Sequence, residues 1–440
     1  MRIERWFALW LLLCAGGVLA APPIQHWRTD NGARVLFIQT RQLPMFDARV
    51  VFDAGSARDG EAHGLAELTN RLLAEGAGAW DADAIAERLD AVGARLDRGV
   101  DRDMAWLSVR ALSEANARDT AVATLAAMIA RPRFGKEAFE RVREQMRIAE
   151  RQARQSADQV AARALYRAIY GRHPYAHDPG GEAATLKALR REQARAFHQR
   201  YYTGANALVV LVGDLDRARA ERIAAQLVGG LARGEAAPAL PAVPRRPAEP
   251  GLKAIDFPSS QTHLLLGQPG MKRGEPDYFP LYVGNHILGG SGLVSRLSKE
   301  VREKRGLAYG AYSYFAPLRQ RGPFVVGAST KNSQAVQALE VMRQTLTRFV
   351  AQGPDEAELK AARQNLIGGF PRKIASNRKL SQYLAVIGFY HYPLDFLERF
   401  PAIIEAVTSK QIRTAFRRRI DPRHLAIIQL GGASGDGETR

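Results

Sequence analysis

The chain has 440 residues, of which 46% are hydrophobic and 25% are charged, as in ordinary globular proteins with about two to four domains. Its single cysteine, Cys14, excludes a disulfide framework and a thiolate metal site. The net charge is +18, but acidic and basic residues alternate along stretches such as residues 140–154. We therefore expect a solvated basic surface that attracts anionic lipid or acidic peptides, and no nucleic-acid partner.

The first twenty residues predict a secretory signal peptide, residues 1–20. Arg2 and Arg5 form a basic start, residues 6–20 are almost entirely apolar, and Val18-Leu19-Ala20 is a small-residue cleavage motif. The apolar run is shorter than the about 20 residues that span a bilayer, so a retained anchor is the less favoured alternative. We expect a mature chain that starts near Ala21, lies in the periplasm, and contains neither a thiol nor a transmembrane segment.

The elements predicted after residue 20 follow one order twice. The first region, residues 21–233, has strands at 33–40 and 47–55, a helix at 63–76, paired strands at 94–112, helices at 115–130 and 136–170, and a buried strand at 206–215. An Ala/Pro-rich linker follows at residues 234–251.

The second region, residues 252–433, has a strand at 262–270, a glycine-rich turn and a helix that begins at Leu293, paired strands at 307–330, helices at 332–352 and 355–369, and a strand at 424–432. Residues 434–440 form a tail. The repeated order predicts an internally duplicated α+β fold.

Several stretches resemble the M16, or insulinase-like, peptidase family over nearly the whole mature chain. FDAGSARDG and HGLAELTNRLLAEGAG resemble that family's first strand and active-site helix. HPY with YYTGANALVVLVGDLD resembles the end of its first domain, and RLSKEVREKRGLAYGAYSYF resembles its second-domain motif. The resemblance implies two homologous α+β domains, each an antiparallel-rich sheet packed with helices, which close like a clamshell over a peptide.

The zinc motif of active family members is replaced in this chain. Those members carry His-x-x-Glu-His on the first helix, and the matching positions here are Glu67, Asn70 and Arg71. Arginine offers no lone pair, and a guanidinium about 4 Å from a divalent cation repels it by roughly 8 kcal/mol at an effective dielectric of 20. We predict no metal site, and an ion pair between Glu67 and Arg71. Glu144 and Glu150 lie near the expected third ligand, but we interpret both as exposed helical charges.

The nine histidines predict no alternative metal site. His173 and His177 are four residues apart, but Pro174 argues against one helical face. His63 could reach Glu67, yet two ligands do not make a catalytic site. The others occur singly and are expected to be satisfied or exposed: His26, His198, His263, His286, His391 and His424.

The second region retains an arginine and a tyrosine of the family motif. Leu293, Leu297 and Val301 are predicted on one helical face, with Arg302 at its edge, and Tyr309 opens the next strand. The resemblance implies that Tyr309 donates to the scissile carbonyl as a catalytic and substrate-binding residue, and that Arg302 holds the peptide. The alternative is a surface arginine beside a strand tyrosine.

These inferences lead to one main hypothesis. The chain is a non-catalytic, substrate-binding subunit of an exported heterodimeric M16 zinc metalloendopeptidase that acts on peptides or unfolded polypeptides. A homologous partner with an intact motif holds the zinc, and this chain has no cofactor and is inactive alone. The alternatives are a structural or assembly scaffold without a proteolytic role, and an active peptidase with unusual ligands.

Overall fold

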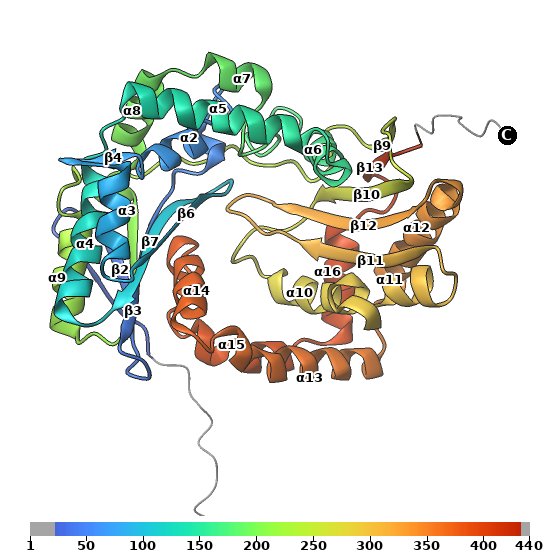
Figure 1. The fold of residues 1–440 in the computed structure, drawn as a ribbon. Helices are drawn as coiled ribbons and strands as arrows, with labels where there is room; N and C mark the ends of the chain where they lie inside the picture. Colours follow the sequence, from blue (N-terminus) through green and yellow to red (C-terminus); the bar gives the residue numbers. More distant parts are fainter. Residues whose placement is uncertain (1–22, 433–440) are drawn as a thin grey trace, which may run out of the picture.

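The computed structural model describes residues 23–432, so the predicted signal peptide and the tail at residues 434–440 lie outside the described residues. The chain forms two sheets, each covered by helices (Figure 1). Among residues 23–432, no helix combines the length and apolar character needed to span a bilayer.

The first sheet has six strands in the order β1-β2-β8-β3-β7-β6, and only β2 and β8 pair in parallel. Its strands are β1 (Gln25–Arg28), β2 (Arg34–Gln39), β3 (Met45–Phe52), β6 (Arg95–Val100), β7 (Ala105–Leu112) and β8 (Ala207–Gly213). A small separate ladder joins β4 (Gly76–Ala77) and β5 (Trp80–Asp81). The helices of this half are α2 (Leu65–Leu72), α3 (Ala82–Asp90), α4 (Ala115–Ala130), α5 (Lys136–Ala153), α6 (Ala157–Tyr170), α7 (Ala183–Ala188), α8 (Arg191–Tyr201) and α9 (Arg217–Val228).

The second sheet has five strands in the order β11-β12-β10-β13-β9, with one parallel pair, β13 and β9. Its strands are β9 (Gly251–Ile255), β10 (Gln261–Pro269), β11 (Ala308–Phe315), β12 (Pro323–Lys331) and β13 (Ala426–Leu430). The helices are α10 (Tyr278–Asn285), the short α11 (Arg296–Ser298), α12 (Ala335–Gln352), α13 (Glu356–Lys373), α14 (Asn377–Phe389), α15 (Phe396–Glu405) and α16 (Ser409–Arg419).

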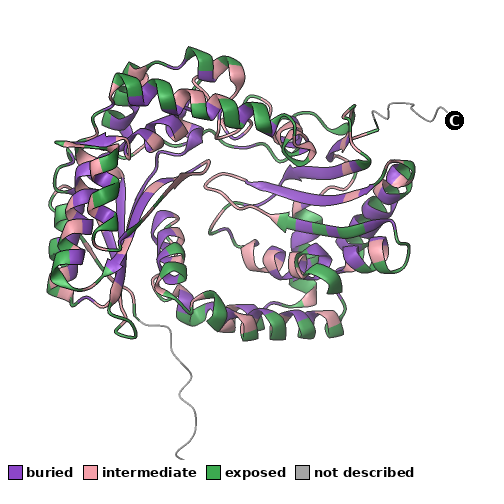
Figure 2. Cartoon of the chain, viewed as in Figure 1, coloured by how far each residue is buried: buried purple, intermediate pink, exposed green. Residues whose placement is uncertain are grey.

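The strand orders confirm the predicted duplication. The order β2-β8-β3-β7-β6 matches β9-β13-β10-β12-β11, and the parallel pair of β2 with β8, the last strand of the first half, matches that of β9 with β13, the last strand of the second half. The fold is therefore two homologous α+β domains with antiparallel-rich sheets. Strands β8, β10 and β12 are mostly buried, whereas half of the residues of β11 are exposed (Figure 2).

Each half contributes one helix to the sheet of the other half. Helix α6 packs on β10 and β13, and α14, its equivalent in the second half, packs on β8 and β3. Both crossings are close: a Cβ added to Gly267 would lie 2.8 Å from Ile169 of α6, and one added to Gly388 of α14 would lie 2.6 Å from Leu208. Because each sheet buries apolar side chains against a helix of the other half, the two halves share their cores.

Two predicted helices differ from the structure. The helix expected over residues 136–170 is interrupted between α5 and α6, where Ser156 is extended, with ψ of 115°, and directly precedes α6. The helix expected from Leu293 begins only at Arg296, because Ser295 is extended and its hydroxyl caps Ser298. Leu293 is consequently 57% exposed, whereas Leu297 and Val301 are buried as predicted.

The predicted linker is packed against both halves of the chain. No helix or strand occurs between Val228 and Gly251, but Val243 is buried. Arg58 donates to the carbonyl of Pro238 at 2.6 Å, and the His173 ring hydrogen bonds to that of Pro241 at 2.9 Å. The division of the chain at residues 234–251 stays a prediction.

Asp103 joins the two halves through one buried carboxylate. It accepts hydrogen bonds from the hydroxyls of Tyr175 at 2.5 Å and Tyr390 at 2.8 Å, and from the backbone N–H of Arg319 at 2.7 Å. Arg319 also pairs with Asp53 at 3.1 Å. The turn between β11 and β12 is thereby tied to the first half.

Candidate functional site

The start of α2 is fixed by a buried carboxylate. Asp59 accepts hydrogen bonds from the backbone N–H groups of Gly64 at 2.8 Å and Ala66 at 2.7 Å, which satisfies donors that a helix start leaves free. Gly64 has a φ of 95°, and an added Cβ would lie 2.9 Å from Leu186. In the sequence, Asp59 reads as one charge in a polar loop, so this role was not predicted.

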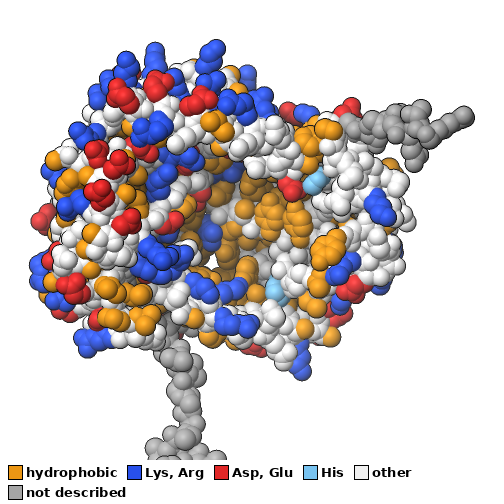
Figure 3. All heavy atoms as spheres, in the orientation of Figure 1, with side chains coloured by type: hydrophobic (Ala, Val, Ile, Leu, Met, Phe, Trp, Pro, Cys, Tyr) orange, Lys and Arg blue, Asp and Glu red, His pale blue; other side chains and the backbone are white. Residues whose placement is uncertain are grey.

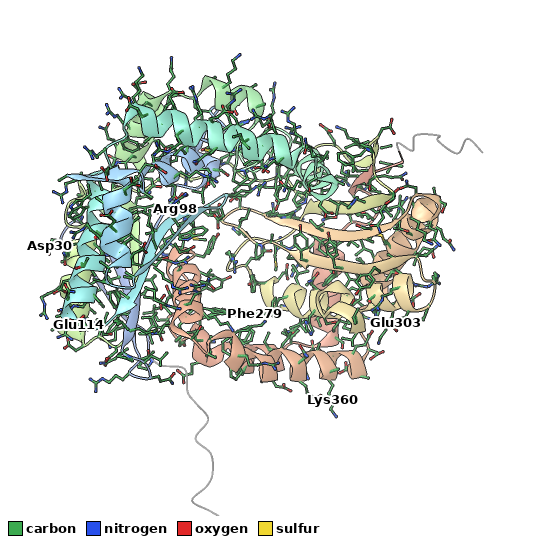
Figure 4. The ribbon with its side chains drawn as sticks, viewed as in Figure 1. Asp30, Arg98, Glu114, Phe279, Glu303 and Lys360 are labelled. Carbon is green, nitrogen blue, oxygen red and sulfur yellow. The ribbon has the colours of Figure 1, made fainter. Side chains whose placement is uncertain are left out.

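The predicted ion pair is present on α2. Arg71 donates to Glu67 at 2.6 Å, and the two side chains are 30% and 16% exposed. Asn70 is fully buried and donates to the carbonyl of Trp106 at 3.2 Å. Arg98 lies where β6 passes α2 (Figure 4), and burial lowers the pKa of its guanidinium, while the Glu67 carboxylate opposes that shift.

These residues do not fit zinc. The Glu67 carboxylate is already paired with Arg71, and the guanidinium groups of Arg71 and of the nearby Arg98 offer no lone pair to a metal. Within the described part of the chain, no three His, Cys, Asp or Glu side chains come together as a set of metal ligands. Zinc hydrolases use three protein ligands and an open position, so α2 cannot provide such a site.

The two glutamates on α5 both pair with arginine. Glu144 binds Arg147 at 2.6 Å and Arg151 at 3.4 Å, as expected for an exposed helical charge. Glu150 is buried, which contradicts the prediction of exposure, and it pairs with Arg154 at 2.5 Å. The reason is that arginines lie over this carboxylate: besides Arg154, Arg163 of α6 comes to 3.8 Å from it and is itself 17% exposed.

The histidines near α2 serve hydrogen bonds and stacking. His177 hydrogen bonds to Asp59 at 3.2 Å, and the His63 ring stacks on His177 with centroids 4.1 Å apart. Burial, followed by the neighbouring His177, lowers the pKa of His63. His173 instead contacts the linker, so His173 and His177 do not share a site. The buried His198 binds the carbonyl of Ile129 at 2.8 Å, as expected of a satisfied histidine.

Arg302 and Tyr309 lie together at the start of β11. The guanidinium carbon of Arg302 is 5.3 Å from the centre of the Tyr309 ring, a cation–π distance. Tyr309 is 89% exposed, and neither side chain forms a hydrogen bond or ion pair within residues 23–432. Both polar groups are therefore available to a ligand.

A β-bulge aligns Tyr309 with two further tyrosines. The pairing of β11 with β12 shifts between Ala308 and Ala311, so that both alanines face the core and Tyr309 falls on the same side as Tyr312 and Tyr314. In a regular strand, residues three apart would point to opposite faces. Tyr312 and Tyr314 stack with centroids 6.1 Å apart.

The exposed tyrosines occupy the part of the second sheet that α6 leaves uncovered. Tyr312 pairs with Gly327 and Tyr314 with Val325, and Val325 belongs to the apolar cluster beneath α6. The space-filling view shows apolar side chains, a class that includes tyrosine, gathered over β11 and β12 beside the central hollow (Figure 3). The strands β6 and β11 each pair on one side only, so their outer N–H and C=O groups are open to an added strand.

Comparisons with known proteins agree with this geometry. The model of a family described as Insulinase (Peptidase family M16) matches residues 34–178, and that of the Peptidase M16 inactive domain matches residues 188–366. The uncharacterized zinc protease YmxG of Bacillus subtilis is 23% identical over 370 residues, which cover 82% of this chain and 87% of that protein. An uncharacterized zinc protease of Streptomyces coelicolor is 33% identical over 193 residues, 43% of this chain and 42% of that protein.

Solved structures extend the similarity over nearly the whole chain. A crystal structure of a peptidase M16 inactive domain from Pseudomonas fluorescens has a TM-score of 0.90 and 37% identity, and covers 93% of this chain and 98% of that one. A protease from Helicobacter pylori shares the fold, with a TM-score of 0.85, 17% identity, and coverage of 93% and 100%. Since two M16 family models match consecutive parts of the chain and a 37% identical M16 structure matches nearly all of it, the chain belongs to the M16, insulinase-like peptidase family.

Proposed function

We propose that this chain is the substrate-binding, non-catalytic subunit of an exported heterodimeric M16 zinc metalloendopeptidase that acts on peptides or unfolded polypeptides. One observation carries the proposal: Arg302 and the exposed Tyr309 are paired, and neither side chain has another polar partner among residues 23–432, whereas the zinc-motif positions on α2 hold an ion pair. A homologous subunit with an intact motif, in the same periplasmic compartment, supplies the zinc and the residues that activate water.

Each residue of the pair has a separate task in this proposal. The Tyr309 hydroxyl donates a hydrogen bond to the scissile carbonyl oxygen as that oxygen gains negative charge. Arg302 binds a backbone carbonyl or carboxylate of the peptide through its fork of N–H groups. The peptide itself adds as a strand to an open sheet edge, where main-chain hydrogen bonds provide affinity without a fixed sequence.

The names of relatives support a proteolytic setting for the chain. Those relatives are called zinc proteases, and the similar solved structure is called an inactive domain. A chain of this fold without a zinc site takes part in proteolysis only if another chain brings the metal. A pure scaffold would have no need for an exposed Arg–Tyr pair beside an open strand.

Reconstitution tests the proposal. The mature chain is mixed with an exported M16 homologue that carries an intact zinc motif, preferably one encoded by a neighbouring gene, and peptide cleavage is measured for each chain alone and for the mixture. We expect activity only in the mixture, together with a heterodimer in size-exclusion chromatography. A stable heterodimer whose activity does not depend on this chain would favour the scaffold alternative.

A further inference from the structure

A cavity of about 390 Å³ in the second half is lined by seven arginines. They come from three separate parts of the chain: Arg245 and Arg246 from the linker, Arg321 from the turn between β11 and β12, and the remainder from the end of α16 and the turn after it. Ligand sites in proteins are typically about 300–1,000 Å³. The cavity shares no lining residue with the Arg302–Tyr309 pair.

The arginines exceed the carboxylates that could neutralise them. Arg419 pairs with Asp277 at 2.7 Å and Glu275 at 3.0 Å, and Arg418 also binds Asp277. Arg423 pairs with Asp421 at 3.4 Å. No carboxylate among the described residues pairs with the other four arginines, Arg245, Arg246, Arg321 and Arg417.

Arg321 lies among other guanidinium groups that repel it. Among residues 23–432 its side chain donates only to the carbonyl of Val243, at 2.8 Å. Burial, followed by the nearby Arg419, lowers the pKa of Arg321; Glu275 opposes this shift, and Arg245 adds to it. An anion bound between these groups would remove this repulsion.

A buried glutamine holds the cavity wall in place. Gln268, which is 2% exposed, donates to the carbonyl of Arg419 at 2.7 Å and accepts from the N–H of Asp421 at 3.0 Å. The turn that carries the arginines after α16 is thus fixed to the end of β10. Stabilisation of the α16 C-terminus by cations would explain Arg417, Arg418 and Arg419, but not the arginines that converge from the linker and the β11–β12 turn.

We propose that this cavity binds an anion with several phosphoryl groups. The cations are all arginine, whose planar fork matches phosphate oxygens in a bidentate way. No aromatic side chain lines the cavity, so nothing would stack on a nucleobase, and recognition rests on the phosphates. Free oligophosphate and the phosphates of a lipid headgroup have this chemistry in common.

The test uses the purified mature chain with two probes. Tripolyphosphate binding is measured by isothermal titration calorimetry, and lipid binding by flotation with phosphatidylcholine vesicles with and without cardiolipin, whose headgroup carries two phosphates. Arg245→Gln/Arg246→Gln removes two exposed guanidiniums that make no polar contact with other described residues, so folding should be retained. The matched control, Arg151→Gln/Arg222→Gln, makes the same change in net charge on α5 and α9.

We expect the cavity variant to bind about 10- to 100-fold more weakly, and the control to bind like the wild type. If the cavity variant alone loses binding to tripolyphosphate, the ligand is a free oligophosphate. If it loses binding only to the negatively charged vesicles, the ligand is a lipid headgroup. Equal loss in both variants would mean non-specific attraction to a chain with net charge +18, and absence of binding to either probe would equally overturn the proposal. Neither of these failures affects the proposed proteolytic role, because the cavity and the Arg302–Tyr309 pair are separate.

Discussion

Replacing Tyr309 by phenylalanine removes one hydroxyl group and should leave the fold unchanged. The side chain is 89% exposed, and its hydroxyl has no hydrogen-bond partner within the described residues. No buried group therefore loses a partner, and the ring that faces Arg302 at 5.3 Å is kept. We expect the free energy of unfolding to change by less than about 0.5 kcal/mol, as for ordinary surface substitutions.

In the reconstituted pair, the same change should lower turnover strongly. If the hydroxyl donates to the developing oxyanion, its loss should reduce kcat on the order of 100- to 1000-fold, or about 2.7–4 kcal/mol of transition-state stabilisation. KM should change little, because strand pairing and Arg302 still hold the peptide. Arg302→Ala should show the opposite division, with weaker peptide binding and a smaller effect on turnover.

Steady-state kinetics on the pair, with assembly checked by size-exclusion chromatography, would measure both effects. Tyr312→Phe is the matched control, since Tyr312 lies on the same strand and face and is 45% exposed. Its loss should leave kcat close to that of the wild type. Wild-type turnover of Tyr309→Phe in an intact heterodimer would refute the reasoning, and an equal loss in Tyr312→Phe would show that the effect is not specific to the Tyr309 hydroxyl.

Three further predictions concern the chain by itself. Elemental analysis of the purified chain should find no stoichiometric zinc, and one tightly held zinc per chain would contradict our interpretation of α2. Asp103→Ala should lower the free energy of unfolding, measured in urea, by about 3–5 kcal/mol, because it leaves the buried donors of Tyr175, Tyr390 and the Arg319 N–H without their acceptor. A loss below about 1 kcal/mol would mean that water replaces the carboxylate as the acceptor of these donors. Burial raises the pKa of Asp101 from its usual 3.8 to about 6, so the folded state binds this proton more tightly than the unfolded state, and the contribution of Asp101 to stability falls as pH rises from about 4 to about 6. Asp101→Asn keeps the acceptor oxygen that binds the N–H groups of Asp103 and Met104. In urea titrations, this variant should be more stable than the wild type by on the order of 1–3 kcal/mol at pH 7, but not at pH 4. An equal effect at both pH values would contradict the raised pKa of Asp101.

The features that depend on local spacing were predictable from the sequence. Glu67 and Arg71 are four residues apart on one helix, and that spacing alone brings them together. The duplication could be inferred because both halves repeat one order of apolar strands and amphipathic helices. Leu293 was assigned wrongly, because the apolar spacing continues through Ser295 although the backbone is extended there.

Features that depend on contacts between distant segments were not predictable. Periodicity shows that α6 and α14 have an apolar face, but it does not show that each covers the sheet of the other half. The common face of Tyr309 and Tyr312 requires a bulge, and without it their spacing indicates opposite sides of a strand. The arginine cavity combines residues about 170 positions apart in the chain, each of which reads alone as an ordinary surface charge.

The exchange of α6 and α14 offers a physical reason why one half could lose its zinc ligands without loss of the fold. The apolar face of α2 packs into the first core, whereas Glu67 and Arg71 remain partly exposed, so the former ligand positions contribute little to burial. The relative position of the two sheets depends on α6, α14 and the buried Asp103 junction, none of which involves those positions. Since Tyr309 and Arg302 belong to the second half, their placement relative to the first half is set by that junction. Replacement of the zinc-motif residues and retention of the Arg302–Tyr309 pair are therefore structurally independent, which is the condition that the proposed division of labour between two homologous subunits requires.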